Sequence, residues 1–139
     1  MTAGLPPESD AIEDQAKKCQ NRVAIVEDER DLVEVYVRLC ALKGLQVSFI
    51  AYNGCEAVYM FSGCDIPDVI LIDHRMPSMT GLEAMRKMLD INPCAKFVFL
   101  SADEEVKPEA MKAGARAFLK KPASLMEIYN TLMKVIGEP

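Results

Sequence analysis

The sequence lacks several features that mark common classes of protein. Its five cysteines are odd in number and include no C-x-x-C pair, so neither a disulfide framework nor a zinc site is indicated. We expect three or four of them to be buried thiols in a reducing cytosol. No apolar run approaches the roughly 18 residues of a membrane span, and no basic segment with an apolar run after it opens the chain. We therefore expect a cytoplasmic protein without a signal peptide.

Basic runs and nucleotide-binding motifs are missing as well. The formal net charge is −5, and no cluster of Lys and Arg offsets repulsion by phosphates, so we expect no direct contact with nucleic acid and no insertion into a membrane. The absence of a G-x-G-x-x-G motif excludes the usual dinucleotide site. The length of 139 residues, half of them hydrophobic, suits one globular domain with a full core.

Residues 1–20 form a polar segment that we treat as an N-terminal arm. It contains Gly4, Pro6 and Pro7 and precedes the first strand-like run. From Asp10 its acids come first and its lysines last, which is typical of a short helix. The alternative is a solvated terminus without structure of its own.

Short apolar runs alternate with helical patterns from Arg22 onward. The runs predict five strands at residues 23–26, 46–52, 69–73, 96–100 and 115–119. The helical patterns lie at residues 30–43, 55–61, 82–90, within 104–113, and at 124–136. Pro108 is compatible only with the first turn of the fourth helix. Five repeats of strand and helix predict an α/β fold, a doubly wound five-stranded parallel sheet with helices on both faces.

Polar side chains follow the ends of four predicted strands. Glu27-Asp28 follows the first, Asp73 ends the third, Ser101 follows the fourth and Lys121 follows the fifth. The second strand offers nothing comparable, which suits a sheet edge and the strand order 2-1-3-4-5. Because ligands bind outside the carboxyl ends of such strands, we expect three carboxylates, one hydroxyl and one ammonium in one pocket.

This set of groups favours phosphoryl chemistry. Three neighbouring carboxylates repel one another and need a raised pKa or a cation. Oxygen ligands without histidine or thiolate suit Mg²⁺. A carboxylate on Mg²⁺ beside a lysine is placed to attack phosphorus and form an acyl phosphate. Asp73 is the predicted acceptor, and Ser101 could donate its hydroxyl to the transferred group.

In their order and spacing, six motifs resemble the receiver domain of two-component response regulators, and the chain is similar to free-standing chemotaxis receivers. The match runs from about Asn21 to Ile136. The motifs are Glu27-Asp28, Ala51-x-Asn53-Gly54-x-Glu56-Ala57, Asp73-x-x-Met76-Pro77-x-x-x-Gly81, Ser101-Ala102, Gly114-Ala115 and Lys121-Pro122. The resemblance implies a flavodoxin-like fold. It also implies that a sensor histidine kinase or a small phosphodonor phosphorylates the chain.

The same resemblance implies roles for individual residues. The Mg²⁺ ligands would be Glu27, Asp28 and Asp73, with the backbone carbonyl of Arg75. Ser101 and Lys121 would hold the phosphoryl group, and Ser101 with Phe118 would form the switch. Three further residues would tune dephosphorylation, namely His74, Arg75 and Asp103. An ion pair between the last two could shield the acyl phosphate from water.

Each of these assignments has a structural alternative. Glu27-Asp28 could be only a helix cap, and Ser101 could cap the next turn. Lys120 could be confused with Lys121, although the spacing to the following proline favours Lys121. Phe118 could be a plain core aromatic residue. A phosphatase of the haloacid dehalogenase type would need an acid at position 75, where this chain has arginine.

Three functions are compatible with the sequence. In the first, residues 21–139 are a receiver without an output domain, which signals through a downstream protein partner after phosphorylation of Asp73. In the second, the chain is a phosphate sink that drains a kinase and hydrolyses its own acyl phosphate. In the third, it is a scaffold without phosphoryl chemistry. We expect no enzymatic activity beyond its own phosphorylation and dephosphorylation, and a phosphorylation-dependent homodimer is left open.

Overall fold

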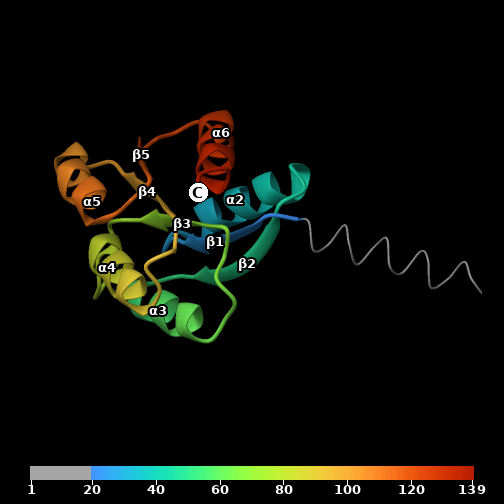
Figure 1. Cartoon of the computed structure of the whole chain (residues 1–139). Coiled ribbons are helices and arrows are strands. Elements are labelled where there is room, and N and C mark those ends of the chain that lie inside the picture. Colours follow the sequence, from blue (N-terminus) through green and yellow to red (C-terminus); the bar gives the residue numbers. More distant parts are fainter. Residues whose placement is uncertain (1–19) are drawn as a thin grey trace, which may run out of the picture.

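A computed structural model describes residues 20–139, which form one parallel sheet flanked by helices (Figure 1). The strand order is β2-β1-β3-β4-β5, and every neighbouring pair is parallel, as predicted. The elements are β1 (Arg22–Val26), α2 (Arg30–Leu42), β2 (Gln46–Ala51), α3 (Gly54–Ser62), β3 (Val69–Asp73), α4 (Gly81–Ile91), β4 (Phe97–Ser101), the 3-10 turn η1 (Glu104–Val106), α5 (Lys107–Ala113), β5 (Ala117–Lys120) and α6 (Leu125–Ile136). The short helix suggested before residue 20 lies outside the described residues.

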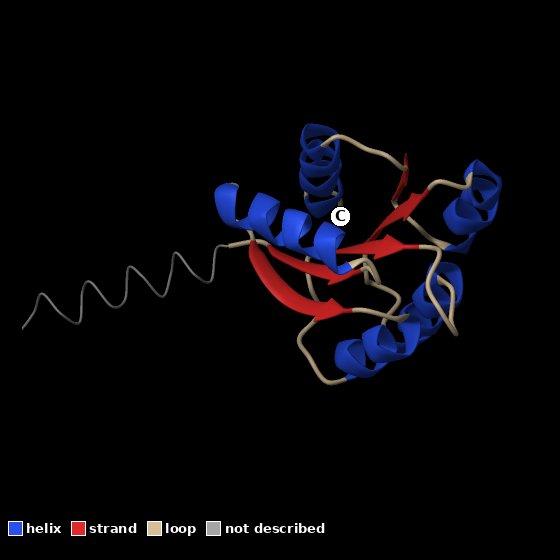
Figure 2. Ribbon diagram, turned by 180° about the vertical axis from the view of Figure 1, so that it is seen from behind, coloured by secondary structure: helices blue, strands red, loops and turns tan. Residues whose placement is uncertain are grey.

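The helices form two layers, one on each face of the sheet (Figure 2). Helices α3, α4 and α5 pack on one face, and α2 and α6 pack on the other. Successive residues of a strand point to opposite faces. On β1, Ala24 and Val26 therefore join the first layer, and Val23 and Ile25 join the second. This arrangement confirms the predicted doubly wound architecture.

The strands differ in burial according to their place in the sheet. All five residues of β3 and of β4 are buried, because these strands are covered on both faces. At the sheet edge, β2 leaves Gln46 exposed and Val47, Ser48 and Ile50 half-buried, as the alternation in its sequence predicts. The two fully buried strands thus bring their final residues, Asp73 and Ser101, into the interior.

The segment between β4 and β5 contains the weakest helical pattern of the sequence. It folds as the 3-10 turn η1 followed by the short helix α5, and Pro108 lies in the first turn of α5, as predicted. Strand β5 starts at Ala117, two residues later than predicted. The reason is that the Ala115 amide still donates to the Ala110 carbonyl, 3.0 Å away, and so closes the end of α5.

The expectation of mainly buried cysteines is wrong. Only Cys40 is buried among the cysteines that the structure describes, and Cys55, Cys64 and Cys94 are exposed. Cys55 lies between the buried Gly54 and Ala57 on the outer side of α3, and Cys94 lies in the turn before β4. No helix within residues 20–139 is both long enough and apolar enough to cross a bilayer.

Candidate functional site

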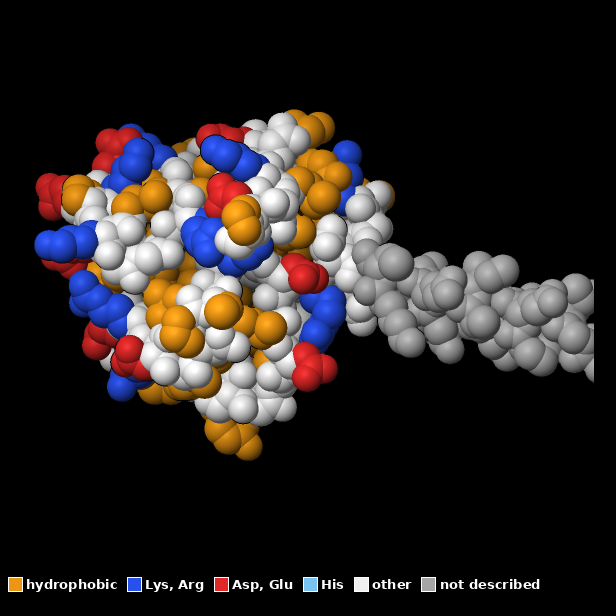
Figure 3. Space-filling view, viewed as in Figure 1, with side chains coloured by type: hydrophobic (Ala, Val, Ile, Leu, Met, Phe, Trp, Pro, Cys, Tyr) orange, Lys and Arg blue, Asp and Glu red, His pale blue; other side chains and the backbone are white. Residues whose placement is uncertain are grey.

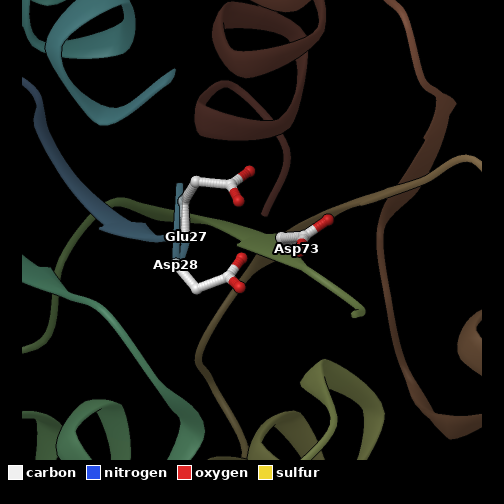
Figure 4. Close-up of side chains that lie close together, drawn as sticks. All are labelled: Glu27, Asp28 and Asp73. Carbon is white, nitrogen blue, oxygen red and sulfur yellow. The ribbon is translucent and has the colours of Figure 1, made fainter. Parts of the chain in front are cut away.

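Three carboxylates meet at the carboxyl ends of β1 and β3 (Figure 4). Glu27 and Asp28 directly follow β1, and Asp73 is the last residue of β3. One carboxylate oxygen from each of the three residues lies within 4.8 Å of the corresponding oxygens of the other two. Glu27 is 1% exposed and Asp73 is 4% exposed, so two of the three negative groups have left bulk water. The predicted meeting of these residues at one sheet edge is confirmed.

Lys121 brings a cation to this cluster from the end of β5. Its Nζ lies 2.8 Å from Glu27 Oε1 and 2.9 Å from Asp73 Oδ1. The neighbouring Lys120 points outward instead and approaches Glu104 at 3.8 Å between exposed side chains. The structure therefore places Lys121 at the site, as its spacing to Pro122 predicted.

Burial and, to a smaller extent, mutual repulsion raise the pKa values of the two buried acids of the cluster. Burial raises the pKa of Glu27 to about 7, although the hydrogen bond from Lys121 acts against this. Burial also raises the pKa of Asp73, again opposed by the hydrogen bond from Lys121. Burial alone would lower the pKa of Lys121, but its hydrogen bonds to Glu27 and Asp73 outweigh burial and raise it. A further cation would relieve this repulsion, and a set of carboxylate oxygens is what Mg²⁺ prefers.

Ser101 completes the inner wall of the site at the end of β4. It is 1% exposed, and it borders a cavity of about 180 Å³ together with Asp73 and Lys121. Its Oγ accepts a hydrogen bond of 3.0 Å from the Asp103 amide, so the alternative of a turn cap is also present. As an acceptor in this bond, the Ser101 hydroxyl keeps its own proton for donation into the cavity.

The alternative that Glu27-Asp28 only caps a helix is not supported. Helix α2 begins at Arg30, and its N-cap residue is Glu29, whose side chain makes no capping hydrogen bond. Glu27 Oε2 accepts from the Glu29 amide at 3.3 Å, while its other oxygen binds Lys121. Both acids are therefore available to the cluster.

The residues expected to tune dephosphorylation are arranged differently from the prediction. Arg75 is exposed and borders the 180 Å³ cavity, but within residues 20–139 it makes no ion pair with Asp103. Asp103 Oδ1 instead accepts from the Glu105 amide at 3.1 Å and caps η1. The expected shielding ion pair is thus wrong in this structure, where a local backbone donor occupies one oxygen of Asp103.

His74 and Phe118 are connected through the ring of Phe99. The His74 and Phe99 ring centroids are 5.5 Å apart, and those of Phe99 and Phe118 are 5.9 Å apart. His74 is half-buried, and its Nδ1 has no hydrogen-bond partner among residues 20–139. Phe118 is half-buried on β5 and packs against the core on the α4 side. This position is compatible with a movable aromatic ring and with a plain core residue.

The loop after Asp73 is fixed by a close approach that requires glycine. A Cβ on Gly81 would collide with the carbonyl oxygen of Asp73, and the Gly81 amide donates to the His74 carbonyl at 2.8 Å. Directly before it, Thr80 and Glu83 form a capping box at the start of α4. The sequence motif that ends in Gly81 thus sets the backbone position of the predicted acceptor.

One residue beside the site was missed by the sequence reasoning. Tyr36 on α2 is 5% exposed and lines a second cavity together with Lys121. Helical periodicity places Tyr36 on the buried side of α2 with Val33 and Leu39. The sequence did offer a signal for this residue, namely a tyrosine hydroxyl on the buried side of α2, about two turns after Glu27-Asp28.

The fold and the site together define a flavodoxin-like α/β protein with an acidic centre and a lysine at the carboxyl edge of its sheet. Comparison with known families is in agreement. The chain belongs to the response regulator receiver domain family, whose profile matches residues 23–133. Receiver domains of two-component systems generally bind Mg²⁺, and the acidic cluster is suitable for this ion.

Individual relatives support the same family. The chemotaxis protein CheY of Thermotoga maritima is 34% identical over 116 residues, which cover 82% of this chain and 96% of that protein. The transcriptional regulatory protein YesN of Bacillus subtilis is 31% identical over 121 residues, or 84% of this chain, but only 33% of its own length is matched. Among solved structures, the response regulator domain of Thermotoga maritima CheB has a TM-score of 0.78 at 25% identity and covers 86% of this chain and 98% of that one.

Proposed function

We propose that Asp73 accepts a phosphoryl group from a sensor histidine kinase in a Mg²⁺-dependent reaction, and that residues 21–139 then signal through a protein partner. The observation that supports this most directly is the contact of 2.9 Å between Lys121 Nζ and Asp73 Oδ1. It gives a buried carboxylate a cationic neighbour at the end of the central strand. That is the arrangement a nucleophilic carboxylate needs near a phosphoryl group.

The proposed metal ligands are the three carboxylates of Glu27, Asp28 and Asp73, with the backbone carbonyl of Arg75. Mg²⁺ bound there would supply positive charge against the phosphoryl oxygens. The carboxylates offer this ion oxygen ligands only, and the raised pKa values of the buried Glu27 and Asp73 are consistent with a site that a cation would stabilise. Glu27 and Asp73 are buried, which limits the contact of the reacting carboxylate with bulk water.

The remaining residues act on the phosphoryl group once it is transferred. The Lys121 ammonium stabilises negative charge on the group, and the Ser101 hydroxyl donates a hydrogen bond to it. Movement of Ser101 toward the group would open space for Phe118, whose ring packs on Phe99. In this proposal, Phe118 reports phosphorylation to the outer surface of β5, where a partner or a second copy of the chain can bind.

Intact-mass spectrometry with a small phosphodonor tests this function. The protein is incubated with acetyl phosphate and Mg²⁺, with and without EDTA. We expect a gain of one phosphoryl group that EDTA prevents, and no gain in the Asp73→Asn protein. Phosphorylation of the Asp73→Asn protein would refute the acceptor assignment, and a gain that is insensitive to EDTA would refute the role of the metal.

A phosphate sink is the second candidate function. It is favoured by the missing ion pair between Arg75 and Asp103 within residues 20–139, because no such pair then shields the acyl phosphate from water. His74, Arg75 and Asp103 would set the rate of hydrolysis in either case. The decay of the phosphorylated mass after removal of the donor distinguishes the two: a long-lived species indicates a signal, and a rapidly hydrolysed one indicates a sink.

A further inference from the structure

A second, larger cavity opens beside the acidic site. Its volume is about 600 Å³, and it lies between the first turns of α2 and the start of α6. The side chains of Leu32, Val35 and Tyr36 line it from α2, and Leu125 lines it from α6. Val35 is 38% exposed and Leu125 is 43% exposed, so the cavity presents apolar surface to solvent.

The two cavities meet at shared residues. Ala102 and Lys121 border both the 180 Å³ cavity over Asp73 and the 600 Å³ cavity. Lys121 is the one charged residue that lines the larger cavity within the described part of the chain. A molecule with its phosphoryl group at Asp73 therefore extends past Lys121 toward an apolar compartment.

We propose that this apolar cavity holds the leaving group of a small phosphodonor, so that the chain prefers acyl phosphates with an extended apolar acyl chain. The inference rests on the proposed function of Asp73. In the reaction, an Asp73 carboxylate oxygen forms a bond to phosphorus, and the bond between phosphorus and the acyl oxygen breaks. The electron pair leaves with the acyl carboxylate, and no proton is transferred.

The direction of this reaction fits the arrangement of the cavities. In phosphoryl transfer, the attacking and leaving oxygens lie roughly in line with phosphorus. Because Asp73 is buried, the leaving carboxylate departs on the side of phosphorus away from Asp73, and Lys121 and Ala102 on the cavity wall also border the apolar cavity. Lys121 can then neutralise the leaving carboxylate, and the acyl chain of the leaving group contacts Val35 and Leu125.

A comparison of acetyl phosphate with butyryl phosphate tests this inference. The two leaving carboxylates are nearly equal in acidity, so the second-order rate constants differ mainly by contacts of the acyl chain. Full burial of two more methylene groups corresponds to a preference of roughly 15-fold, and burial of half that area to about fourfold. We therefore expect butyryl phosphate to react about four times faster in intact-mass time courses at fixed Mg²⁺.

Two variants of α6 locate the effect. Leu125→Ser removes apolar surface from the cavity and should bring the ratio of butyryl to acetyl rate constants close to one. Met126→Ser is the matched control, because Met126 is 57% exposed on the next position of α6 and does not line the cavity. Its ratio should remain that of the unmodified protein.

The outcomes separate this inference from the function on which it rests. Reaction with acetyl phosphate but a ratio near one in the unmodified protein overturns the leaving-group site and leaves the acceptor role of Asp73 standing. A ratio that is equally high after Leu125→Ser also overturns it. If neither donor phosphorylates the protein in the presence of Mg²⁺, both the leaving-group site and the small-donor chemistry at Asp73 are contradicted.

Discussion

Lys121 lies between two buried carboxylates, and this position gives it a structural role in addition to its proposed chemical one. Its Nζ is 2.8 Å from Glu27 and 2.9 Å from Asp73. Its side chain is 21% exposed, whereas those of its two partners are 1% and 5% exposed. Removal of the ammonium would leave both acids in the interior without a cation.

Substitution of Lys121 should therefore destabilise the metal-free protein. We expect Lys121→Ala to lower the free energy of unfolding by about 2 to 3 kcal/mol in EDTA, because uptake of a proton by a buried acid offsets part of the cost of an unpaired charge. Urea denaturation measures this. Lys120→Ala is the control, because that exposed side chain only approaches Glu104, and it should change stability by less than about 0.5 kcal/mol. Equal losses in the two variants would contradict the account.

Asp28 is the half-buried member of the carboxylate cluster, and it follows β1 directly. If it is a metal ligand, Asp28→Asn should weaken Mg²⁺ binding at least about tenfold. Mutation of a residue that only hydrogen-bonds to a ligand already lowers metal affinity by about that factor, and loss of a direct ligand should lower it no less. Isothermal titration calorimetry measures the affinity. Asp31→Asn makes the same charge change on the exposed side of the first turn of α2 and should leave the affinity within about twofold. An unchanged affinity in Asp28→Asn would remove Asp28 from the site.

At the scale of single elements, the loop from Asp73 to α4 depends on one glycine. A side chain on Gly81 would meet the carbonyl of the proposed acceptor, whereas a side chain on Gly63, at the end of α3, would meet nothing within 4 Å in the described part of the chain. Neither glycine has a positive φ, so the two substitutions differ in steric contact and not in backbone preference.

Gly81→Ala should therefore be destabilising. Relief of the collision has to shift the backbone of β3 or of α4, and overpacking of this kind costs about 1 to 3 kcal/mol. Thermal denaturation followed by circular dichroism gives the comparison. Gly63→Ala should stay within about 0.5 kcal/mol of the unmodified protein. A neutral Gly81→Ala variant would show that the loop is not held as described.

The sequence predicted most elements because their hydrophobic periods are clear. The apolar run before Asp73 is too short for a helix, and it is β3 in the structure. The start of β5 was not predictable in this way, since Ala115 and Arg116 directly precede the apolar run of the strand but Ala115 is hydrogen-bonded to the end of α5. Periodicity describes side-chain burial and does not show which amide closes a helix.

The side-chain partner of Asp103 could not be predicted from the sequence either. Asp103 follows Ser101 by two residues, as Arg75 follows Asp73, and these matching positions suggest a pair. The Asp103 carboxylate accepts a hydrogen bond from the Glu105 amide instead. The choice between a distant cation and a nearby backbone donor depends on local geometry. The spacing that placed Glu27, Asp28, Asp73, Ser101 and Lys121 at one edge was sufficient, because parallel strands bring their carboxyl ends together.

At the scale of the whole molecule, the sheet and its two helical layers bring together residues that are up to 94 positions apart, as in the bond between Lys121 and Glu27. Charges of both signs are interspersed over the face drawn in Figure 3. The acidic site is thus built from β1, β3, β4 and β5 at once. A ligand bound there acts on the stability of the whole sheet.

Binding of Mg²⁺ should consequently stabilise the folded protein. At a concentration ten times the dissociation constant, a ligand specific for the folded state contributes about 1.4 kcal/mol. Differential scanning calorimetry should show a midpoint that rises with Mg²⁺ and returns to its starting value with EDTA. The Asp28→Asn protein should show much less of this rise at the same concentration, and an equal rise in both proteins would indicate binding elsewhere.

The central claim is that Asp73 itself carries the phosphoryl group, and reductive trapping tests it most directly. Borohydride converts an aspartyl phosphate to homoserine, and trypsin then separates residues 44–75, which include Asp73, from residues 23–30, which include Glu27 and Asp28. Fragmentation of the peptide of residues 44–75 should place homoserine at position 73 only after incubation with phosphodonor and Mg²⁺. Homoserine at position 28, or at Asp65 or Asp68 in the same peptide, would contradict the account.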